Sequence, residues 1–256
     1  MFGRHLFEGK VVLISGAAGG VGSAVARLLR RSGADLALTS THPQRLLALA
    51  DELGAQAIVA DMVSVAGCQH IVDEALARHG RLDALVNCAG VWTEGDSALV
   101  TEDDWDRCVD VNLKGAFFLC SRAIPALKAT RGAIVNVGSD AGVVGNAGCA
   151  VYCASKGGLV LMGKALALEL ASFGVRVNTV CPSDIATPML QRQADIFGGG
   201  DPQGYLDRLL SRYPQRDPRF IHSEEVANLI AFLLAAPATP ITGATLSMDF
   251  GITAGY

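Results

Sequence analysis

The stretch VVLISGAAGGVGSAVARLL, residues 11–29, joins an apolar run, a glycine-rich turn and an apolar helical pattern. The glycines are Gly16, Gly19, Gly20 and Gly22. Glycine lets the backbone turn sharply and lets a phosphate approach without a Cβ in the way. The helix that begins here offers free N–H groups and a partial positive charge to an anion. The stretch therefore predicts a strand–turn–helix unit that binds a dinucleotide pyrophosphate, or else a tight turn without a ligand.

The rest of the chain repeats this alternation of apolar runs and helical patterns. The runs are continuously apolar, which is typical of strands buried on both faces of a parallel sheet. The expected strands are residues 10–16, 35–40, 56–61, 82–90, 132–139, 175–182 and 243–249. The expected helices are residues 22–32, 43–53, 64–79, 101–128, 150–172 and 223–235. This order predicts an α/β fold: a Rossmann-like, doubly wound parallel sheet of about seven strands with helices on both faces.

We expect one domain over residues 1–256, with a single excursion at about 183–222. This segment contains FGGGDPQG (197–204) and YPQRDPRF (213–220). Clustered glycine and proline interrupt regular structure and indicate a mobile segment. The segment follows the carboxyl end of an expected strand, where ligands bind in open α/β sheets, so it is the natural lid candidate.

Composition excludes several other classes of protein. The net charge is −4 and no basic block is present, so we expect no nucleic acid partner. No apolar run reaches about 18 residues, and the start lacks the pattern of a secretory signal, so we expect no membrane association. The seven cysteines are scattered without a CxxC pair, as in a reduced cytoplasmic protein. Cys149 and Cys153 lie one helical turn apart without partner ligands, so we expect no metal site.

The stretch CAVYCASKGGL (149–159) carries Tyr152 and Lys156 on one face of an expected helix. A free tyrosine has a pKa of about 10 and is a poor base at neutral pH. A nearby ammonium group favours the phenolate and lowers that pKa, which suits general acid–base catalysis. By itself, however, this spacing also fits an ordinary solvated helix face.

Three further features favour catalysis. Ser139 ends the run GAIVNVGS (132–139), and NCAG (87–90) ends a second run at the same sheet edge. Asn112 lies within the expected helix 101–128, where asparagine is unfavourable unless it has a tertiary role. The alternative for Asn112 is a polar group satisfied between two helices.

Together these residues resemble the short, single-domain branch of the short-chain dehydrogenase/reductases, over nearly the whole chain from Lys10 to Ala254. Ser15 stands where that family usually has Thr. The matching positions are Gly16-x-x-x-Gly20-x-Gly22, Asp61, Asn87–Gly90, Asn112, Ser139, Tyr152-x-x-x-Lys156, Asn178 and Pro182–Thr187. The resemblance implies an NAD(P)-dependent oxidoreductase that interconverts a secondary alcohol and a ketone, and it implies a homotetramer.

The resemblance also implies a role for each catalytic position. Tyr152 would be the general acid for ketone reduction and the base for alcohol oxidation. Lys156 would lower the tyrosine pKa and bind the nicotinamide ribose. Ser139 would bind the substrate oxygen, and Asn112 would hold a water in a proton relay.

The cofactor contacts follow from the same resemblance. Asp61 would accept from the adenine amino group beside the Met62 backbone, and Thr187 and the Ile185 backbone would hold the carboxamide. The full set of expected cofactor-binding residues is Ser15, Gly16, Gly20, Val21, Gly22, Ser40, Thr41, Asp61, Met62, Asn87, Ala89, Gly90, Tyr152, Lys156, Pro182, Ile185 and Thr187.

The second expected strand indicates which nicotinamide dinucleotide is used. A carboxylate at its end would bind the ribose 2′-OH and repel a 2′-phosphate, but Ser40 stands there instead. Ser40 and Thr41 can donate to a phosphate, and His42 or Arg45 can add charge. The basic residues that NADP-dependent relatives usually carry are nevertheless missing. The balance favours NADP over NAD.

The substrate is a small-molecule alcohol or ketone of undetermined identity. The expected pocket wall is Trp92, Asp140, Ala141, Asn146, Ser183 and the lid around Met189–Tyr205. Three arginines, at 192, 208 and 212, either attract an anionic substrate or form a solvated helix face. A 3-oxoacyl thioester, a polyol, a cyclic diol and a small hydroxyketone all remain open. The alternatives from other classes are a non-catalytic redox sensor and a sugar-nucleotide epimerase, for which the chain after Thr187 is short.

Overall fold

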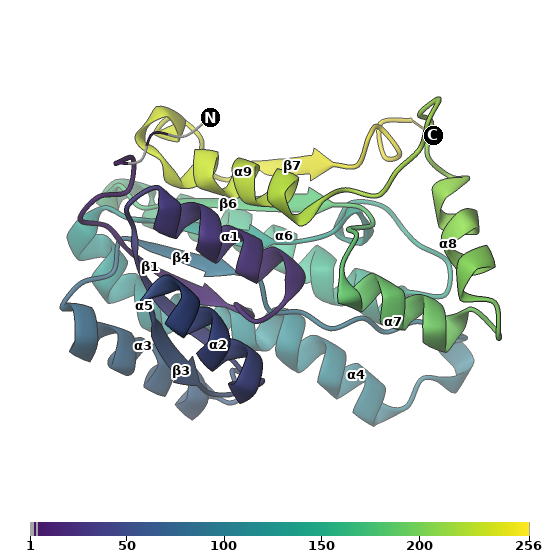
Figure 1. The fold of residues 1–256 in the computed structure, drawn as a ribbon, viewed down its shortest axis with the longest axis horizontal. Coiled ribbons are helices and arrows are strands. Elements are labelled where there is room, and N and C mark those ends of the chain that lie inside the picture. Colours follow the sequence, from purple (N-terminus) through teal and green to yellow (C-terminus); the bar gives the residue numbers. More distant parts are fainter. Residues whose placement is uncertain (1–2, 4, 256) are drawn as a thin grey trace.

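The computed structural model describes residues 3 and 5–255, so the ends of the predicted domain 1–256 lie outside the described residues. Seven parallel strands form one sheet in the order β3-β2-β1-β4-β5-β6-β7 (Figure 1). The strand order reverses beside β1, which places a crevice at the carboxyl ends of β1 and β4. The predicted Rossmann-like, doubly wound sheet is confirmed.

Each strand lies within the segment predicted for it; β2 has the predicted bounds and the other six strands are shorter. The strands are β1 (Val11–Ser15), β2 (Asp35–Ser40), β3 (Gln56–Val59), β4 (Ala84–Asn87), β5 (Ala133–Val137), β6 (Arg176–Pro182) and β7 (Thr245–Met248). Their register places Ser15 beside Asn87 and Asn87 beside Asn136, so three central strands end level with one another. The segments beyond these ends leave the sheet at a common edge and are free to build a site.

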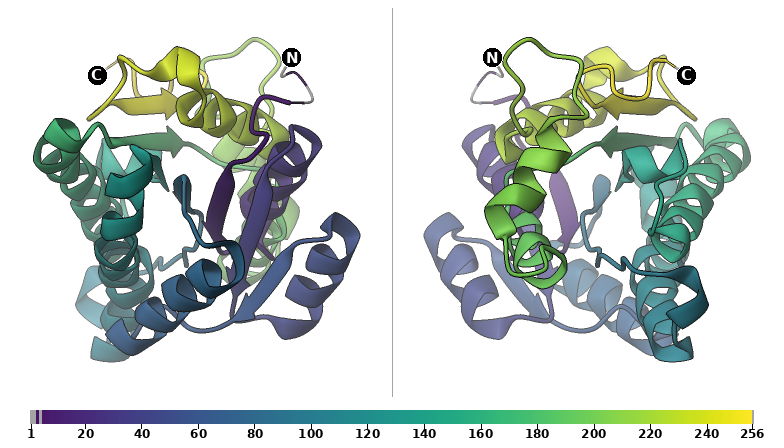
Figure 2. Two further views of the ribbon diagram at one scale, coloured as in Figure 1. Left: turned by 90° about the vertical axis from the view of Figure 1, so that its left-hand side faces the viewer. Right: turned by 90° about the vertical axis from the view of Figure 1, so that its right-hand side faces the viewer.

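Helices cover both faces of the sheet (Figure 2). Val12 and Ile14 of β1 pack into one apolar cluster, and Val11 and Leu13 pack into the other. This alternation reflects the two-residue period of a strand. The first cluster includes α1 (Gly20–Arg31), α2 (Pro43–Leu53) and α9 (Ser223–Leu234); the second includes α3 (Val65–His79), α5 (Ala116–Thr130) and α6 (Ala150–Leu170).

The single helix predicted for residues 101–128 is interrupted. It consists of α4 (Glu102–Val109), a π-helical segment (Asp110–Gly115) and α5. The π segment contains Asn112, whose side chain bonds to the backbone of another loop, and Gly115, where a Cβ would lie 2.7 Å from the Met62 carbonyl oxygen. Tertiary contacts therefore override the helical period here, as is common for π-helical turns at functional sites.

The excursion at 183–222 contains two helices that the sequence reasoning did not predict, α7 (Pro188–Phe197) and α8 (Pro202–Leu210). Their prolines occupy the first helical turn, where a missing N–H is not needed, so they begin helices rather than break them. Thr187 and Asp201 cap them by accepting from backbone N–H groups. A bridge between Ile185 and Ile221 brings the two ends of the excursion together.

The helical stretch Ala150–Phe173 is long and apolar enough to cross a membrane by length and composition alone. Half of that apolar window is buried inside the fold. The same length and composition therefore fit a core helix, which is how α6 packs against the sheet.

Candidate active site

The glycine turn after β1 packs directly on the NCAG turn after β4. Gly16 has a φ of 63°, and a Cβ there would lie 2.6 Å from the Ala89 backbone nitrogen. Ser15, fully buried, accepts a hydrogen bond from that same nitrogen. The two turns therefore form one continuous edge, and only glycine fits at position 16.

The N-terminus of α1 is open toward this edge. Its N-cap, Gly19, provides no side-chain hydrogen bond, and the first turn carries no acidic residue. Within the described residues, the N–H groups of Gly20, Val21 and Gly22 have no hydrogen-bond acceptor. In α3, α4, α7 and α8 a side chain caps the first turn instead. The exposed N–H groups and the helix dipole of α1 fit an anionic group such as a pyrophosphate.

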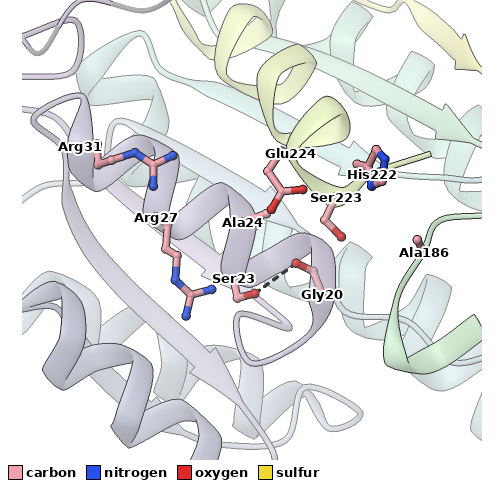
Figure 3. Close-up of a pocket in the computed structure, with 9 residues that line it drawn as sticks. All are labelled: Gly20, Ser23, Ala24, Arg27, Arg31, Ala186, His222, Ser223 and Glu224. Atoms are coloured by element: carbon pink, nitrogen blue, oxygen red, sulfur yellow. Dashed lines mark hydrogen bonds between the residues drawn. The ribbon is translucent and has the colours of Figure 1, made fainter. Parts of the chain in front are cut away.

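The open N-terminus lies against the carboxyl end of β6. A Cβ at Gly20 would lie 2.6 Å from Thr187 Cγ2, so these segments touch although 167 positions separate them. A polar cavity of about 230 Å³ adjoins Gly20 between α1 and the start of α9 (Figure 3). Ser23 donates to the Gly20 carbonyl there at 3.1 Å. None of the four expected catalytic residues lines this cavity.

The expected catalytic side chains gather beside the NCAG turn. Ser139 follows β5, and Tyr152 and Lys156 project from the first turns of α6. All three are nearly buried. Lys156 Nζ donates to the Val137 carbonyl oxygen at 2.9 Å and lies 5.8 Å from the centroid of the Tyr152 ring. Trp92 packs on that ring with the centroids 4.2 Å apart.

Asn112 joins the π-helical segment to the loop after β4. Its Oδ1 accepts from the Val91 N–H at 2.8 Å, and its Nδ2 donates to the Val91 carbonyl oxygen at 2.9 Å. A Cβ at Gly90 would lie 3.3 Å from Asn112 Oδ1 and 3.4 Å from Lys156 Nζ. Asn112 and Lys156 therefore approach the same turn from two different helical segments.

Burial decides the protonation of this pair. It raises the pKa of Tyr152 above its ordinary value, while a hydrogen bond with Ser139 acts in the opposite direction. Burial lowers the pKa of Lys156 to about 8, against nearby thiol groups that raise it. At neutral pH the tyrosine is therefore a neutral proton donor and the lysine is mostly charged.

Several expected cofactor residues have structural partners. Asn87 is buried and donates from Nδ2 to Asn136 Oδ1 at 2.9 Å, which ties β4 to β5. Ser40 Oγ accepts from the His42 N–H, and Asp61 Oδ1 accepts from the Val63 N–H. Met62 is buried. Thr41 is exposed just beyond β2.

The remaining expected cofactor residues lie at the carboxyl end of β6. Pro182 is the last residue of β6, and Ile185 forms the bridge with Ile221 at the base of the excursion.

The sequence reasoning missed a network centred on Glu94. Its Oε2 accepts from Trp92 Nε1 at 2.9 Å, from the Tyr205 hydroxyl at 2.8 Å and from Gln193 Nε2 at 3.4 Å. These donors come from the loop after β4, from α8 and from α7. Residues up to 111 positions apart leave no periodic signal in a sequence, so nothing along the chain indicated this network.

Comparison with known proteins agrees with this geometry. Residues 16–253 match a family model described as enoyl-(acyl carrier protein) reductase. The chain is 35% identical over 251 residues to a 3-oxoacyl-(acyl-carrier-protein) reductase of Thermotoga maritima, covering 96% of this chain and 98% of the relative. It is 36% identical over 251 residues to a meso-2,3-butanediol dehydrogenase of Serratia marcescens, covering 97% and 96%.

A solved structure extends the comparison. The 3-ketoacyl-(acyl-carrier-protein) reductase of Brucella melitensis, complexed with NADH, superposes with a TM-score of 0.86 at 30% identity and covers 96% of this chain and 99% of its own. Within the described part of the present chain, no group of three or more His, Cys, Asp and Glu residues is placed to hold a metal ion. Fold, site geometry and matches together show that the chain belongs to the short-chain dehydrogenase/reductase family of NAD(P)-dependent oxidoreductases.

Proposed function

We propose that Tyr152 is the general acid–base of a reaction that interconverts a secondary alcohol and a ketone. The observation that carries the proposal is its burial beside Ser139 and Lys156, at the sheet edge that also holds the open N-terminus of α1. The neutral phenol donates its proton to a ketone oxygen and accepts it back from the alcohol. A bound nicotinamide supplies or accepts the hydride.

Ser139, Lys156 and Asn112 support that proton transfer. The Ser139 hydroxyl lies beside the phenol. To bind a ketone oxygen it turns toward that oxygen the proton that it donates to Asp140 Oδ1 in this structure. Lys156, anchored on the Val137 carbonyl, provides positive charge next to the tyrosine. The Asn112 side chain holds the Val91 backbone, so we assign it to positioning the loop after β4. A redox sensor without turnover would leave this buried acid–base set unexplained.

NADP is the favoured cofactor. No carboxylate stands at the end of β2, and Ser40, Thr41 and Arg45 can approach a 2′-phosphate from that end. The open first turn of α1 suits the pyrophosphate of either dinucleotide.

The deciding experiment is a panel of secondary alcohols and ketones offered with each dinucleotide and read by absorbance of the reduced nicotinamide. We expect turnover with a higher kcat/KM for NADP(H). Tyr152→Phe should bind the dinucleotide as the parent does while its turnover is lost. Turnover retained in Tyr152→Phe would overturn the acid–base assignment, and a higher kcat/KM with NAD(H) would overturn only the cofactor preference.

A homotetramer in the cytoplasm completes the proposal. Large apolar side chains are exposed on the helices expected to meet other subunits, including Trp105 on α4, Phe117 on α5, and Leu161 and Leu168 on α6. Exposed large apolar side chains of this kind favour a protein–protein contact when they form one patch. The seven free cysteines suit a reducing compartment. Light scattering that gives the mass of a monomer at micromolar concentration would contradict the assembly.

A further inference from the structure

Two aspartates follow neighbouring strands at the edge of the sheet that carries the expected catalytic residues. Asp140 follows Ser139 after β5, and Asp184 follows Ser183 after β6. β5 and β6 are paired in parallel up to Val137 and Val180, and the Gly138 N–H continues the ladder by donating to the Val180 carbonyl at 2.7 Å. Both aspartates therefore lie just beyond the carboxyl ends of these two paired strands. Asp140 directly follows the serine that is expected to bind the reacting oxygen.

Asp140 is joined directly to that serine. The Ser139 hydroxyl donates to Asp140 Oδ1 at 2.8 Å, and the Ala141 N–H donates to the same oxygen at 2.7 Å. Within the described residues no group donates to the other carboxylate oxygen, Oδ2. Asp140 is half-buried and its Oδ2 keeps access to solvent, so a ligand can reach this oxygen. An open carboxylate oxygen beside the serine can accept a hydrogen bond from a ligand hydroxyl. Burial raises the pKa of Asp140.

Asp184 increases the negative charge at this place. The Tyr213 hydroxyl lies 3.1 Å from its Oδ2 and 2.8 Å from Ser183 Oγ. Burial raises the pKa of Asp184 to about 6, and the charge of Asp140 adds to this effect. The positive charge of Arg212 acts on both carboxyl groups, and its Nη2 donates to Asn146 Oδ1 at 3.3 Å. Two carboxylates facing one guanidinium leave acceptors in excess.

The chemistry of the reacting molecule follows from this excess. We propose that Asp140, supported by Asp184, accepts a hydrogen bond from a hydroxyl on the carbon next to the reacting one, so that the substrate is a vicinal diol or the corresponding α-hydroxyketone. The inference rests on the proposed function, because it takes Ser139 as the ligand of the reacting oxygen. The two oxygens of a vicinal diol lie about one hydrogen-bond length apart, which matches the adjacency of Ser139 Oγ and the Asp140 carboxylate.

The same geometry disfavours a 3-oxoacyl thioester. Around its reacting carbon such a molecule presents carbonyl oxygens, which are acceptors, to carboxylates that are also acceptors. A site built to bind a hydroxyl rejects an analogue that lacks it, because its own polar groups are then left unpaired. The excess of carboxylates likewise opposes the earlier alternative of an anionic substrate attracted by Arg212.

The test compares four ketones that differ next to the reacting carbonyl. They are 3-hydroxy-2-butanone, 2-butanone, 2,3-butanedione and the N-acetylcysteamine thioester of 3-oxobutyrate, each reduced with saturating NADPH and again with NADH. A hydrogen bond to a charged acceptor predicts a kcat/KM about 10- to 100-fold higher for the hydroxyketone than for 2-butanone. A preference for the thioester, or equal values for the hydroxyketone and 2-butanone, overturns the inference while leaving the proposed function intact.

Asp140→Asn tests the assigned residue. Its amide oxygen still accepts from Ser139, whereas its NH₂ group donates where the carboxylate accepted. We expect the hydroxyketone to 2-butanone ratio to fall about tenfold and the dione to 2-butanone ratio to rise. Asp73→Asn, which alters an exposed aspartate on α3 that accepts from Gln69, is the matched control and should change neither ratio.

Unchanged ratios in Asp140→Asn refute the role of Asp140. If circular dichroism shows that Asp140→Asn does not fold, Asp184→Asn is used instead, with a smaller expected fall in the hydroxyketone to 2-butanone ratio. The ratios measured for the parent protein test the inference independently of either variant. If none of the four compounds is reduced while other ketones of the panel are, the inference alone is overturned; if no compound of the panel turns over with either dinucleotide, the proposed function is overturned with it.

Discussion

Glu94 offers a direct test of whether α7 and α8, the helices of the expected lid, are held to the expected catalytic site. Replacing it with alanine removes one acceptor from three donors: Trp92, Gln193 and Tyr205. Gln193 and Tyr205 are each 8% exposed, so water cannot fully replace the lost partner. Gln193 retains its bond to the Tyr205 hydroxyl at 2.8 Å. The change therefore separates the lid from the loop after β4 and leaves α7 and α8 joined.

The expected magnitude follows from the two short bonds. A hydrogen bond to a charged acceptor contributes about 1.5–3 kcal/mol, and bonds within one network do not add fully. Because Glu94 is only half-buried, we expect about 2–4 kcal/mol in favour of lid opening. That corresponds to an open population raised by about 30- to 700-fold. Trp92, released from Glu94, would also pack less firmly on the Tyr152 ring.

Limited proteolysis of the folded protein measures this opening. The segment Gly198–Gly200 between the two helices should be cleaved faster in Glu94→Ala in proportion to the open population. KM for the ketone should rise more than kcat falls. Glu94→Gln, which keeps one acceptor oxygen, should lie between the two proteins, and Glu74→Ala on the exposed face of α3 is the control. Cleavage and KM at parent values in Glu94→Ala would refute the view that this network holds the lid.

Three further predictions concern the site itself. Tyr152→Phe should lower kcat about 10²- to 10⁴-fold with the dinucleotide Kd unchanged, as measured by nicotinamide fluorescence; a Kd raised to the same degree would assign the tyrosine to binding instead. Burial lowers the pKa of Lys156 to about 8, so the rate of ketone reduction should be constant through neutral pH and fall above about 8, where the ammonium charge is lost. Burial raises the pKa of Tyr152, so the phenolate that alcohol oxidation requires forms only at alkaline pH, and the rate of oxidation should rise with pH. Identical pH profiles in the two directions would contradict this. Gly20→Ala should raise the Kd of the dinucleotide about tenfold or more, because the added methyl group meets Thr187 and displaces the open first turn of α1; an unchanged Kd by titration calorimetry would show that this turn does not hold the anion.

Local chemistry made most of the fold predictable. Apolar runs buried on both faces give the strands, and 3.6-residue patterns give the helices between them, so the order of elements follows from nearest-neighbour physics. The prolines of the excursion mark the limit of this reasoning. Pro188 and Pro202 look like helix breakers along the chain, yet each occupies a first turn whose cap, Thr187 or Asp201, decides that a helix begins.

The candidate site likewise contains residues that the sequence indicated and contacts that it did not. The glycine turn and the pair Tyr152 and Lys156 were visible because each depends on contacts within one turn or one helix. Asn87 was visible too, but its expected contact with the cofactor stays a prediction, and its side chain joins β4 to β5. Whether the Asn87 amide faces a ligand or a neighbouring strand depends on the register in which the strands pair, and the residue type at one position does not determine that register.

What the sequence by itself determined is therefore the strand–turn–helix repeat and the placement of Tyr152 and Lys156 on one face of a helix, because short-range periodicity is sufficient for both. Only the tertiary structure decided how Asn112 is used, where Glu94 joins α7 and α8 to Trp92, and that Asp140 and Asp184 emerge together. Apart from the bond between Trp92 and Glu94, these relations join residues from 21 to 111 positions apart or on neighbouring strands, and they exist only once the sheet has aligned the carboxyl ends of its strands. The physical reason is that a buried polar group takes its hydrogen-bond partner from the residues that the fold places next to it, and the order of residues along the chain does not show which residues these are.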